Sequence, residues 1–361
     1  MSEKQALQAI RQQIDDIDLQ VQVLLNQRAE MAQEVATIKI ANGEQTDFYR
    51  PEREAMVLRE VMARNKGPLD AKEIARLFRE IMSACLAAEK PLQVAYLGPE
   101  GSFTQTATLK QFGGSIAPRS MSTIADVFNA VEVGNASYGV VPVENSTEGM
   151  VSHTLDRFIN TSLKINGEVS LRIHHYLLSK ETSLAAVTKI YGHPQALAQC
   201  RQWLASHCPH CEQVPVNSNS EAAKTVVTEP GAAAIAANRA AEIYDLVTLA
   251  SNIEDEADNT TRFLVIGRQD IGPSGQDKTA LLVSTKNQPG ALYTILEPLA
   301  KSGITMTRIE SRPSRQGVWE YVFFIDIEGH RDDSDIAKAL SQLEQASSMC
   351  RVLGSYPKAV L

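Results

Sequence analysis

The 361-residue sequence has no long run of apolar residues, little aromatic character and no excess of positive charge. No segment approaches the roughly 18 apolar residues that a membrane-spanning helix needs, and residues 1–16 mix charges with apolar side chains, so we expect neither membrane insertion nor secretion. The 35 Lys and Arg residues against 43 Asp and Glu residues give a net charge of −8, which argues against a nucleic-acid surface. An anionic ligand could still bind where cations cluster locally.

Cysteine is scarce, and the five residues are an odd number. In a long chain without a recognisable leader this favours reduced thiols and a cytoplasmic location. The closest pair, Cys208 and Cys211, has the two-residue gap of metal ligands and lies beside His207 and His210. A zinc site normally needs four ligands, and no second pair of that spacing occurs, so we expect no metal and interpret the segment as the end of a surface helix.

Hydrophobic periodicity in residues 1–90 predicts helices. Apolar residues recur every three or four positions over residues 7–38, which predicts one helix over about residues 5–40. That helix would be roughly 50 Å long, so its apolar stripe must pack on other helices, including those of another chain. Further helices are expected over 51–64 and 69–89. The inward side chains of the last helix are predicted to be Ile74, Leu77, Phe78, Ile81 and Cys85.

After Lys90-Pro91 the pattern changes to short β-like runs separated by helical segments, which predicts an α/β domain over 92–268. Residues 268–277 have the composition of a linker. A third domain at 278–361 is predicted to be ferredoxin-like because its elements follow the order βαββαβ, although such folds host many functions. Its expected elements are strand 279–285, helix 290–302, strands 304–312 and 318–327, helix 333–346 and strand 349–355.

A cation interrupts the apolar stripe of the first helix. The heptad that continues from Leu24 reaches Arg28, and a buried guanidinium needs an anionic partner, either an acid on a neighbouring helix or a bound ligand. Lys39 lies about 20° from Arg28 around the helix and roughly 16 Å along it, so both cations face the same side. Arg11 points about 100° away and lies about 25 Å from Arg28, so it could share a small ligand only from another subunit.

These cations, together with Pro51-Glu52-Arg53-Glu54 and the helix over 81–86 that ends at Glu89, resemble the all-helical chorismate mutase domain of aromatic-pathway enzymes. Such domains form an intertwined dimer in which each site takes one arginine from the partner subunit. The reaction is a pericyclic rearrangement of a dicarboxylate that needs neither nucleophile nor metal, so positioning and charge complementarity must do the catalysis.

The resemblance implies a role for each residue of the mutase site, although Glu89 could instead end its helix and face water. The implied roles are carboxylate binding (Arg11 from the partner subunit, Arg28, Arg53), a border of the substrate site (Cys85), acceptance of the substrate hydroxyl (Glu54) and hydrogen bonds to the ether oxygen (Lys39, Glu89).

Three loops of the α/β segment carry glycines, hydroxyls and amides next to strands: Gly98–Phe103, Val141–Ser146 and Asn259–Phe263. Singly, each could be a plain turn or helix cap, or an anion-binding loop. In order they match the motifs GPxGSF, VPxEN and N-x-TRF, and so resemble prephenate dehydratase. That resemblance implies two lobes like those of periplasmic binding proteins, near 92–171 and 172–250, with substrate in the cleft between them.

The resemblance assigns the leaving hydroxyl of prephenate to Thr261. Glu144 is a candidate proton source if burial raises its pKa, although packing or a helix cap would also explain it. The remaining residues are expected to position substrate or loops: Ser102, Asn145, Ser146, Gln199 and Arg262.

The third segment contains Asn287–Leu292 and Glu310-Ser311-Arg312-Pro313, which resemble the GAL and ESRP elements of the amino-acid-binding ACT domain attached to prephenate dehydratases. Alone, the second element could be an ion pair at a strand end. Family ACT domains pair across subunits, so a bound end product could bias the catalytic cleft. The implied phenylalanine site consists of Gly290, Ala291, Leu292, Glu310 and Ser311.

The resemblance covers the whole chain and implies a multidomain α and α/β enzyme, a homodimer or higher homo-oligomer, without cofactors. It would convert chorismate to prephenate and then to phenylpyruvate, with phenylalanine as allosteric inhibitor. Two alternatives are arogenate as the second substrate and a phenylalanine-binding regulator with inactive catalytic segments. Retention of Arg28, Lys39 and Thr261 argues against the regulator.

Overall fold

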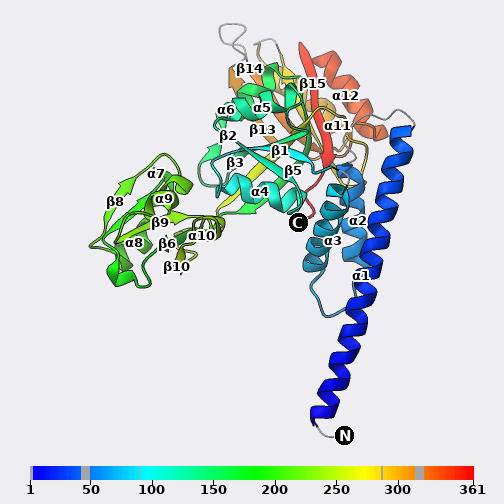
Figure 1. Ribbon diagram of the computed structural model, residues 1–361. Coiled ribbons are helices and arrows are strands. Elements are labelled where there is room, and N and C mark those ends of the chain that lie inside the picture. Colours follow the sequence, from blue (N-terminus) through cyan, green and yellow to red (C-terminus); the bar gives the residue numbers. More distant parts are fainter. Residues whose placement is uncertain (1–2, 42–48, 89, 286–287, 314–320) are drawn as a thin grey trace.

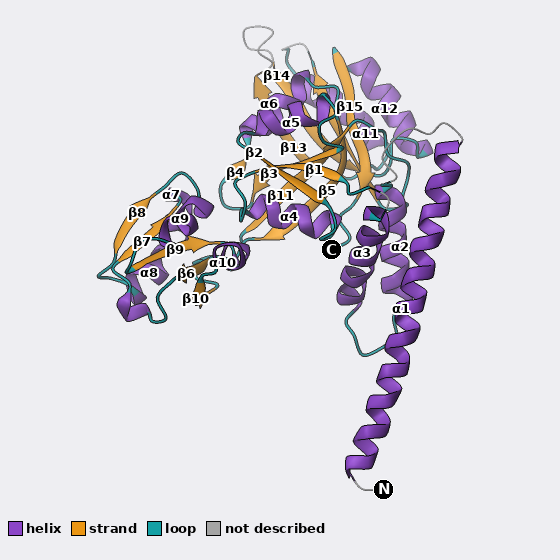
Figure 2. Ribbon diagram, in the orientation of Figure 1, coloured by secondary structure: helices purple, strands orange, loops and turns teal. Residues whose placement is uncertain are grey.

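The computed structural model describes residues 3–41, 49–88, 90–285, 288–313 and 321–361. It consists of a helical segment, a domain of two α/β lobes and a C-terminal α/β domain (Figures 1 and 2). This confirms the predicted fold class.

The helical segment comprises α1 (Glu3–Ala41), α2 (Pro51–Arg64) and α3 (Ala71–Ala87). Pro51 starts α2 at a position where its missing N–H costs nothing, and the Asp70 side chain caps α3 by accepting from the Lys72 amide. Figure 1 shows α1 extending well beyond the other two helices toward the N-terminus. In the described part of the chain, no helix is both long and apolar enough to cross a membrane.

The predicted inward face of α3 is partly wrong. Cys85 is buried, but Leu77 is 39% exposed, and the side chains buried in place of the predicted ones are Ala75, Arg79 and Ser83. This face docks on the neighbouring domain through hydrogen bonds, so its residues are small or polar and the apolar periodicity did not mark it.

The first lobe has a sheet in the order β2-β1-β3-β11-β5, with the short β4 beside β3. Its strands are β1 (Gln93–Leu97), β2 (Ala117–Met121), β3 (Tyr138–Asn145), β4 (Gly149–Met150), β5 (Lys164–Arg172) and β11 (Thr260–Gly267), and its helices are α4 (Phe103–Phe112), α5 (Ile124–Glu132) and α6 (Ser152–Asn160). Because β11 returns from late in the chain to lie between β3 and β5, it brings the third dehydratase-like motif beside the second.

The second lobe is built on a sheet in the order β10-β6-β9-β7-β8. Its elements are β6 (Tyr176–Ser179), the 3-10 helix η1 (Leu184–Ala186), β7 (Lys189–Gly192), α7 (Pro194–Gln199), α8 (Arg201–His207), β8 (Glu212–Pro215), α9 (Asn219–Val226), β9 (Ala232–Ala236), α10 (Asn238–Tyr244) and β10 (Val247–Ser251). The chain enters it through residues 173–175 and leaves through 252–259. Glu254 joins the two crossings by accepting from the His175 amide at 2.8 Å.

The interpretation of Cys208 and Cys211 as part of a surface helix end needs correction. Cys208 ends α8, but its thiol is buried in the core of the second lobe, where burial raises its pKa to about 11. The Cys211 thiol donates to the Val187 carbonyl. Both sulfurs therefore serve packing, and no group of three or more metal-ligating side chains occurs within the residues that the structure describes.

The C-terminal domain has the predicted βαββαβ order, with an antiparallel sheet in the order β13-β14-β12-β15. Its elements are β12 (Asp277–Ser284), α11 (Ala291–Lys301), β13 (Met306–Pro313), β14 (Tyr321–Glu328), α12 (Ser334–Ala346) and β15 (Met349–Pro357). Helices α11 and α12 cover one face of this sheet, where Leu281 and Ile325 are buried. The other face packs on the first lobe, with Leu282 and Phe324 in the same core cluster as Val141.

The C-terminal domain packs so closely on the first lobe at Gly354 that no larger residue should fit there. A Cβ atom there would collide with the backbone of Ile165 on β5. Gly354→Ala should therefore lower the midpoint of thermal unfolding by about 4 °C or more, because overpacking costs about 2 kcal/mol. Gly67→Ala is the matched control, since a Cβ atom there would make only an ordinary contact with the Asn65 side chain at 3.7 Å and the backbone conformation is ordinary. Equal midpoints for the two variants would contradict the tight docking.

Candidate active sites

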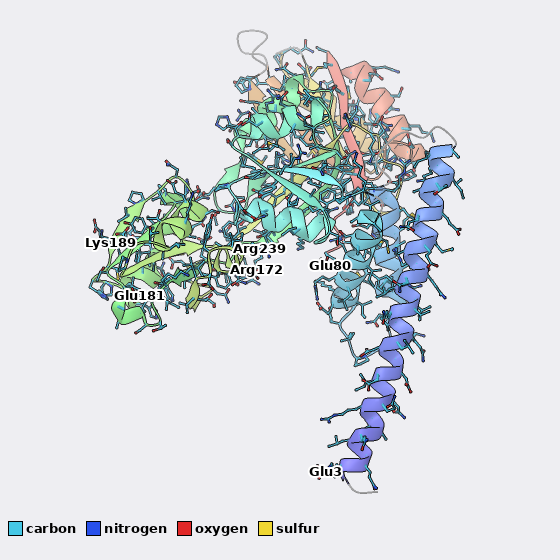
Figure 3. All side chains as sticks on the ribbon, viewed as in Figure 1. Glu3, Glu80, Arg172, Glu181, Lys189 and Arg239 are labelled. Atoms are coloured by element: carbon cyan, nitrogen blue, oxygen red, sulfur yellow. The ribbon has the colours of Figure 1, made fainter. Side chains whose placement is uncertain are left out.

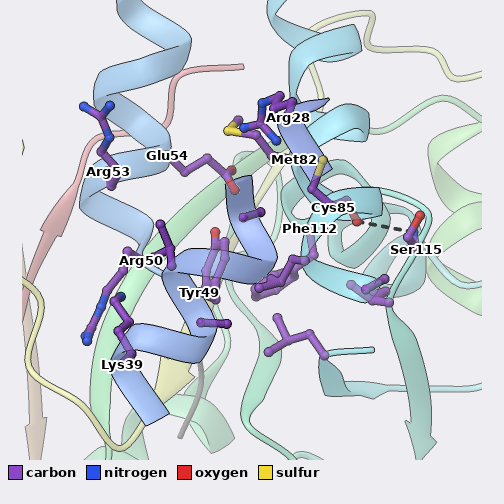
Figure 4. Close-up of a pocket in the computed structure, with 18 residues that line it drawn as sticks. Arg28, Lys39, Tyr49, Arg50, Arg53, Glu54, Met82, Cys85, Phe112 and Ser115 are labelled. Carbon is purple, nitrogen blue, oxygen red and sulfur yellow. Dashed lines mark hydrogen bonds between the residues drawn. The ribbon is translucent and has the colours of Figure 1, made fainter. Parts of the chain in front are cut away.

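The first candidate site is a cavity of about 340 Å³ between α1, α2, α3 and the start of the first lobe. The structure brings together most of the residues predicted for it. Figure 4 shows Arg28 and Lys39 of α1 toward opposite ends of the cavity, with Glu54 of α2 between them. The lining includes the predicted residues Arg28, Lys39, Arg53, Glu54 and Cys85.

Three cations of this cavity, Arg28, Lys39 and Arg53, are available to an anionic ligand. Among the described residues, none of Arg28, Lys39 and Arg53 pairs with an acid, so the alternative of a structural ion pair for Arg28 finds no partner there. Arg11 lies on the projecting part of α1 and does not line the cavity, as expected if it serves a partner's site. Glu89 lies outside the described residues.

Glu54 has an ionic partner that sequence reasoning missed. Its Oε1 accepts from Nε of Arg79 on α3 at 3.0 Å, and both side chains are buried. Burial raises the pKa of Glu54 above its ordinary value, and the Arg79 guanidinium acts in the opposite direction. The sequence did carry an indication of this pair: Arg79 lies four residues from both Ala75 and Ser83, so it stands on a helix face whose other side chains are small.

The second candidate site lies at the ends of β3 and β11. These strands are antiparallel, and Asn145 stands directly opposite Thr261. The Asn145 amide nitrogen donates to Thr261 Oγ1 and to Asn259 Oδ1, both at 2.8 Å. Ser146 fixes the same junction, because its amide donates to the Thr260 carbonyl and its hydroxyl accepts from the Thr260 amide.

The orientation of the Asn145 amide is fixed by its other end. Its Oδ1 accepts from the Thr147 amide at 3.1 Å, the Thr147 hydroxyl at 2.6 Å and the Glu148 amide at 3.1 Å. Three donors hold the oxygen, so the nitrogen must face Thr261. Thr261 Oγ1 accepts this bond and keeps its own proton free to donate.

The second lobe supplies Gln199, as predicted, through a partner that was not predicted. Gln199 Nε2 donates to the Thr147 hydroxyl at 3.3 Å, and its Oε1 lies 2.9 Å from Nε2 of His175. Burial lowers the pKa of His175, so the ring is neutral near pH 7 and donates from Nε2. Sequence reasoning missed His175 because nothing in its local sequence indicates that it lies between the lobes and bonds to Gln199, rather than packing in a core.

Ser102 and the GPxGSF loop sit at the N-terminus of α4. The Ser102 hydroxyl accepts from the Gln105 amide at 3.3 Å, so it caps the helix. The next residue, Phe103, packs edge-on against the His175 ring with centroids 5.5 Å apart. This loop therefore meets the crossing between the lobes.

Arg262 and Glu144 do not share a site with Thr261. Each is adjacent in sequence to a site residue, and successive side chains of a strand point to opposite faces of the sheet. Arg262 faces the C-terminal domain, where it binds Asp326 at 2.8 Å, Glu168 at 2.9 Å and the Tyr356 hydroxyl at 3.0 Å. Glu144 lies on that side too, 4.0 Å from Arg262. We therefore correct the expectation that Arg262 positions substrate and that Glu144 supplies the proton.

The residues predicted to bind phenylalanine lie on two elements of the C-terminal domain. Gly290 precedes α11 with a positive φ of 79°, which glycine adopts without strain, and Ala291 and Leu292 begin the helix. Glu310 and Ser311 lie on the edge strand β13. Glu310 pairs with Phe324 on the face toward the first lobe, so Ser311 points to the opposite face.

Comparison with known proteins bears on both sites. The chorismate mutase type II family model matches residues 10–90, the prephenate dehydratase model residues 94–271 and the ACT domain model residues 279–345. A bifunctional chorismate mutase/prephenate dehydratase of Pseudomonas aeruginosa is 54% identical over 365 residues, which cover 100% of both chains. This chain belongs to that family.

More distant relatives agree with this assignment. The bifunctional chorismate mutase/prephenate dehydratase of Escherichia coli K12 is 33% identical, covering 99% of this chain and 97% of its own. A crystal structure of prephenate dehydratase from Arthrobacter aurescens in complex with L-Phe is 34% identical with a TM-score of 0.69, covering 74% of this chain and 90% of that one. The bifunctional enzyme therefore has its mutase in the helical segment and its dehydratase in the two-lobed domain.

The two sites predict separable losses of activity. Lys39→Ala should remove chorismate mutase activity and leave dehydratase activity, because Lys39 lines only the helical cavity. Thr261→Val should do the reverse, because it deletes the hydroxyl that Asn145 orients, whereas Thr261→Ser should keep most dehydratase activity. Chorismate consumption and phenylpyruvate release from each purified variant provide the measurement. Loss of both activities in a folded variant would contradict two independent sites.

Proposed function

We propose that this protein rearranges chorismate to prephenate, dehydrates and decarboxylates prephenate to phenylpyruvate, and is inhibited by phenylalanine through its ACT domain. Arogenate remains the alternative second substrate, and parallel assays of prephenate and arogenate distinguish the two. The odd number of cysteines in a chain of this length favours reduced thiols, and on that ground we propose a cytoplasmic location.

The mutase proposal is supported by Arg28, Lys39 and Arg53, which line the helical cavity and have no acidic partner among the described residues. Arg28 and Arg53 would hold the two carboxylates of chorismate in a reactive conformation, and Lys39 would donate to the ether oxygen as negative charge develops there. Cations already placed around the cavity can stabilise such charge with little reorganisation, and this rearrangement needs neither a nucleophile nor a metal. Glu54 would accept the hydroxyl of the substrate.

The dehydratase proposal rests on the orientation of Thr261, which is the observation that carries it. Loss of the ring hydroxyl requires a donor at the departing oxygen, and a threonine hydroxyl that already accepts from Asn145 has its proton to offer. Gln199 and Thr147 link this pair to the second lobe, so closure of the lobes on a substrate would tighten the same set of hydrogen bonds.

The regulatory proposal is supported by the ionic network behind β11. Arg262 follows Thr261 and is held by Asp326 of the ACT sheet, while Arg308 of β13 lies 3.6 Å from Asp326 and 4.0 Å from Glu144. Burial opposes the charge of Arg262, yet Tyr356, Asp326 and Glu168 raise its pKa above the ordinary value. A shift of β13 on phenylalanine binding would therefore reach the strands that carry Thr261 and Asn145.

The network predicts that Asp326→Asn uncouples the inhibitor. Phenylalanine affinity, measured by calorimetry, should change little, whereas inhibition of phenylpyruvate formation should weaken by about fivefold or more, which corresponds to a coupling of roughly 1 kcal/mol. Asp335→Asn on the exposed surface of α12 is the matched control. Unaltered inhibition in Asp326→Asn would argue against transmission through Arg262.

A homodimer is supported by the surface of α1. Apolar side chains remain exposed along its whole length, among them Leu7, Ile10, Ile14, Ile17, Val21, Leu24, Met31, Val35 and Ile38. A stripe of this length is costly in water and fits a second copy of the same helix. The partner's copy of α1 would then bring its Arg11 to this chain's cavity.

The dimer proposal is tested by a charge in the middle of the stripe. Ile17→Glu should shift the sedimentation of the protein toward the monomer and lower mutase activity by about tenfold or more, because each site loses an arginine worth at least one charged hydrogen bond. Gln22→Glu, about 140° around the helix, is the matched control. A dimeric Ile17→Glu protein with full mutase activity would rule out α1 as the interface.

A further inference from the structure

One wall of the mutase cavity comes from outside the helical segment. Phe112, Ser115 and Ile116 line it, and they lie at the end of α4 and in the turn before β2, in the dehydratase domain. Figure 4 shows Phe112 and Ser115 on the side of the cavity away from Lys39. The space that would hold chorismate is therefore bounded by two domains.

Helix α3 docks directly on this turn. The Gly114 amide donates to Glu80 at 2.8 Å, and the Ser115 amide donates to the Ser83 hydroxyl at 3.3 Å. Gly113 has a φ of 75°, and a Cβ atom there would meet the Ser83 side chain at 2.6 Å, so the approach requires glycine. Figure 3 locates Glu80 at this junction between the helical segment and the first lobe.

The entrance to α2 is anchored in the dehydratase core. Tyr49 is buried, its ring centroid lies 5.2 Å from that of Phe112 and 5.4 Å from that of Tyr138, and its hydroxyl accepts from Gln111 at 3.2 Å. Tyr49 also lines the mutase cavity. Because α2 begins two residues later, the positions of Arg53 and Glu54 depend on this anchor.

Arg79 joins the two domains at the carboxylate of the site. Its Nε donates to Glu54, and its Nη1 donates to the Lys110 carbonyl at 2.8 Å. Lys110 lies in the last turn of α4, where carbonyls lack helical partners and the helix dipole favours a cation. The dehydratase helix thus fixes the guanidinium, and the guanidinium fixes Glu54.

We propose that the chorismate mutase site of this protein is built by both domains, with residues 110–116 closing the cavity and Arg79 acting as the positioning residue for Glu54. The proposal rests on the role proposed for Glu54. Among the described residues, the charged and titratable groups beside that carboxylate or on the cavity lining are Arg79 and Cys85 from α3, Arg28 and Lys39 from α1, Arg53 from α2, and Tyr49 and Arg50 from the segment before α2.

The role of Arg79 has a signature in the pH dependence of mutase activity. The Glu54 carboxylate accepts from the substrate hydroxyl through a charge-assisted hydrogen bond that is stronger than any bond to the protonated acid, so activity should fall as the pH drops through its pKa. Without the Arg79 charge, burial acts on Glu54 with less opposition and its pKa rises. In the full-length Arg79→Gln enzyme the acid limb of mutase kcat/KM should move up by about one pH unit or more.

Companion variants separate positioning from folding. Arg79→Lys should move the acid limb back toward that of the parent, because it restores the cation. Arg76→Gln, one turn earlier on α3 and paired with the exposed Glu73, should match the parent throughout. Phenylpyruvate formation by the same preparations reports folding and should be unchanged. A profile of Arg79→Gln parallel to that of the parent would overturn the positioning role.

The wall is tested independently of Arg79. Ile116→Ala should raise the KM for chorismate about threefold or more by removing apolar contact area, with dehydratase kinetics unchanged. Ile159→Ala removes the same atoms from another partly buried isoleucine of this lobe, which packs against a different core cluster, so it should not change the KM. An unchanged KM in Ile116→Ala would overturn the two-domain cavity. If Lys39→Ala kept full mutase activity, the site itself would be misplaced, which is a different failure.

Discussion

The pairing of β3 with β11 is the constraint on which the proposed catalytic pair and the proposed route of regulation both depend. Direct opposition of Asn145 and Thr261 puts an amide and a hydroxyl at hydrogen-bond distance on one face of the sheet. The same register sets Glu144 opposite Arg262 on the other face, toward the ACT sheet. Neither pair can move without the other, because they share two strands. The proposed catalytic pair and the proposed regulatory pair are thus held by one set of backbone hydrogen bonds.

Two arginines at the domain junctions have anionic partners, whereas three cations of the helical cavity have none among the described residues. Arg262 and Arg79 are buried and each has fixed anionic partners, so their desolvation is offset and their geometry is specified. Arg28, Lys39 and Arg53 line an open cavity without such partners among the described residues. A dicarboxylate entering that cavity would supply the missing anions, which gives the site its selectivity.

The helical segment depends on neighbours in two directions. Along α1 the apolar stripe is exposed and would be covered in the proposed dimer. Helix α3 and the segment before α2 contact the dehydratase domain through hydrogen bonds of Ser83, Glu80 and Tyr49. A small three-helix unit has little core of its own; docking on the dehydratase domain buries surface that it could not bury alone, and the proposed dimer would bury more. Fusion to the dehydratase is consequently part of how this mutase is stabilised.

The sequence by itself determined the element order, the position of each motif and most of the mutase site, because helical periodicity places Arg28 and Lys39 on one side of α1 and turn residues mark the strand ends. From the sequence, Thr261 and Arg262 were both expected at the dehydratase site, whereas in the structure they are successive residues of β11 and face opposite sides of its sheet. Which of those sides is the substrate cleft depended on where the ACT sheet packs, and only the tertiary structure decided that. Partnerships such as Arg79 with Glu54, or His175 with Gln199, join residues more than twenty positions apart. Local pattern carries no information about such contacts, since they arise from how separately formed elements dock against one another.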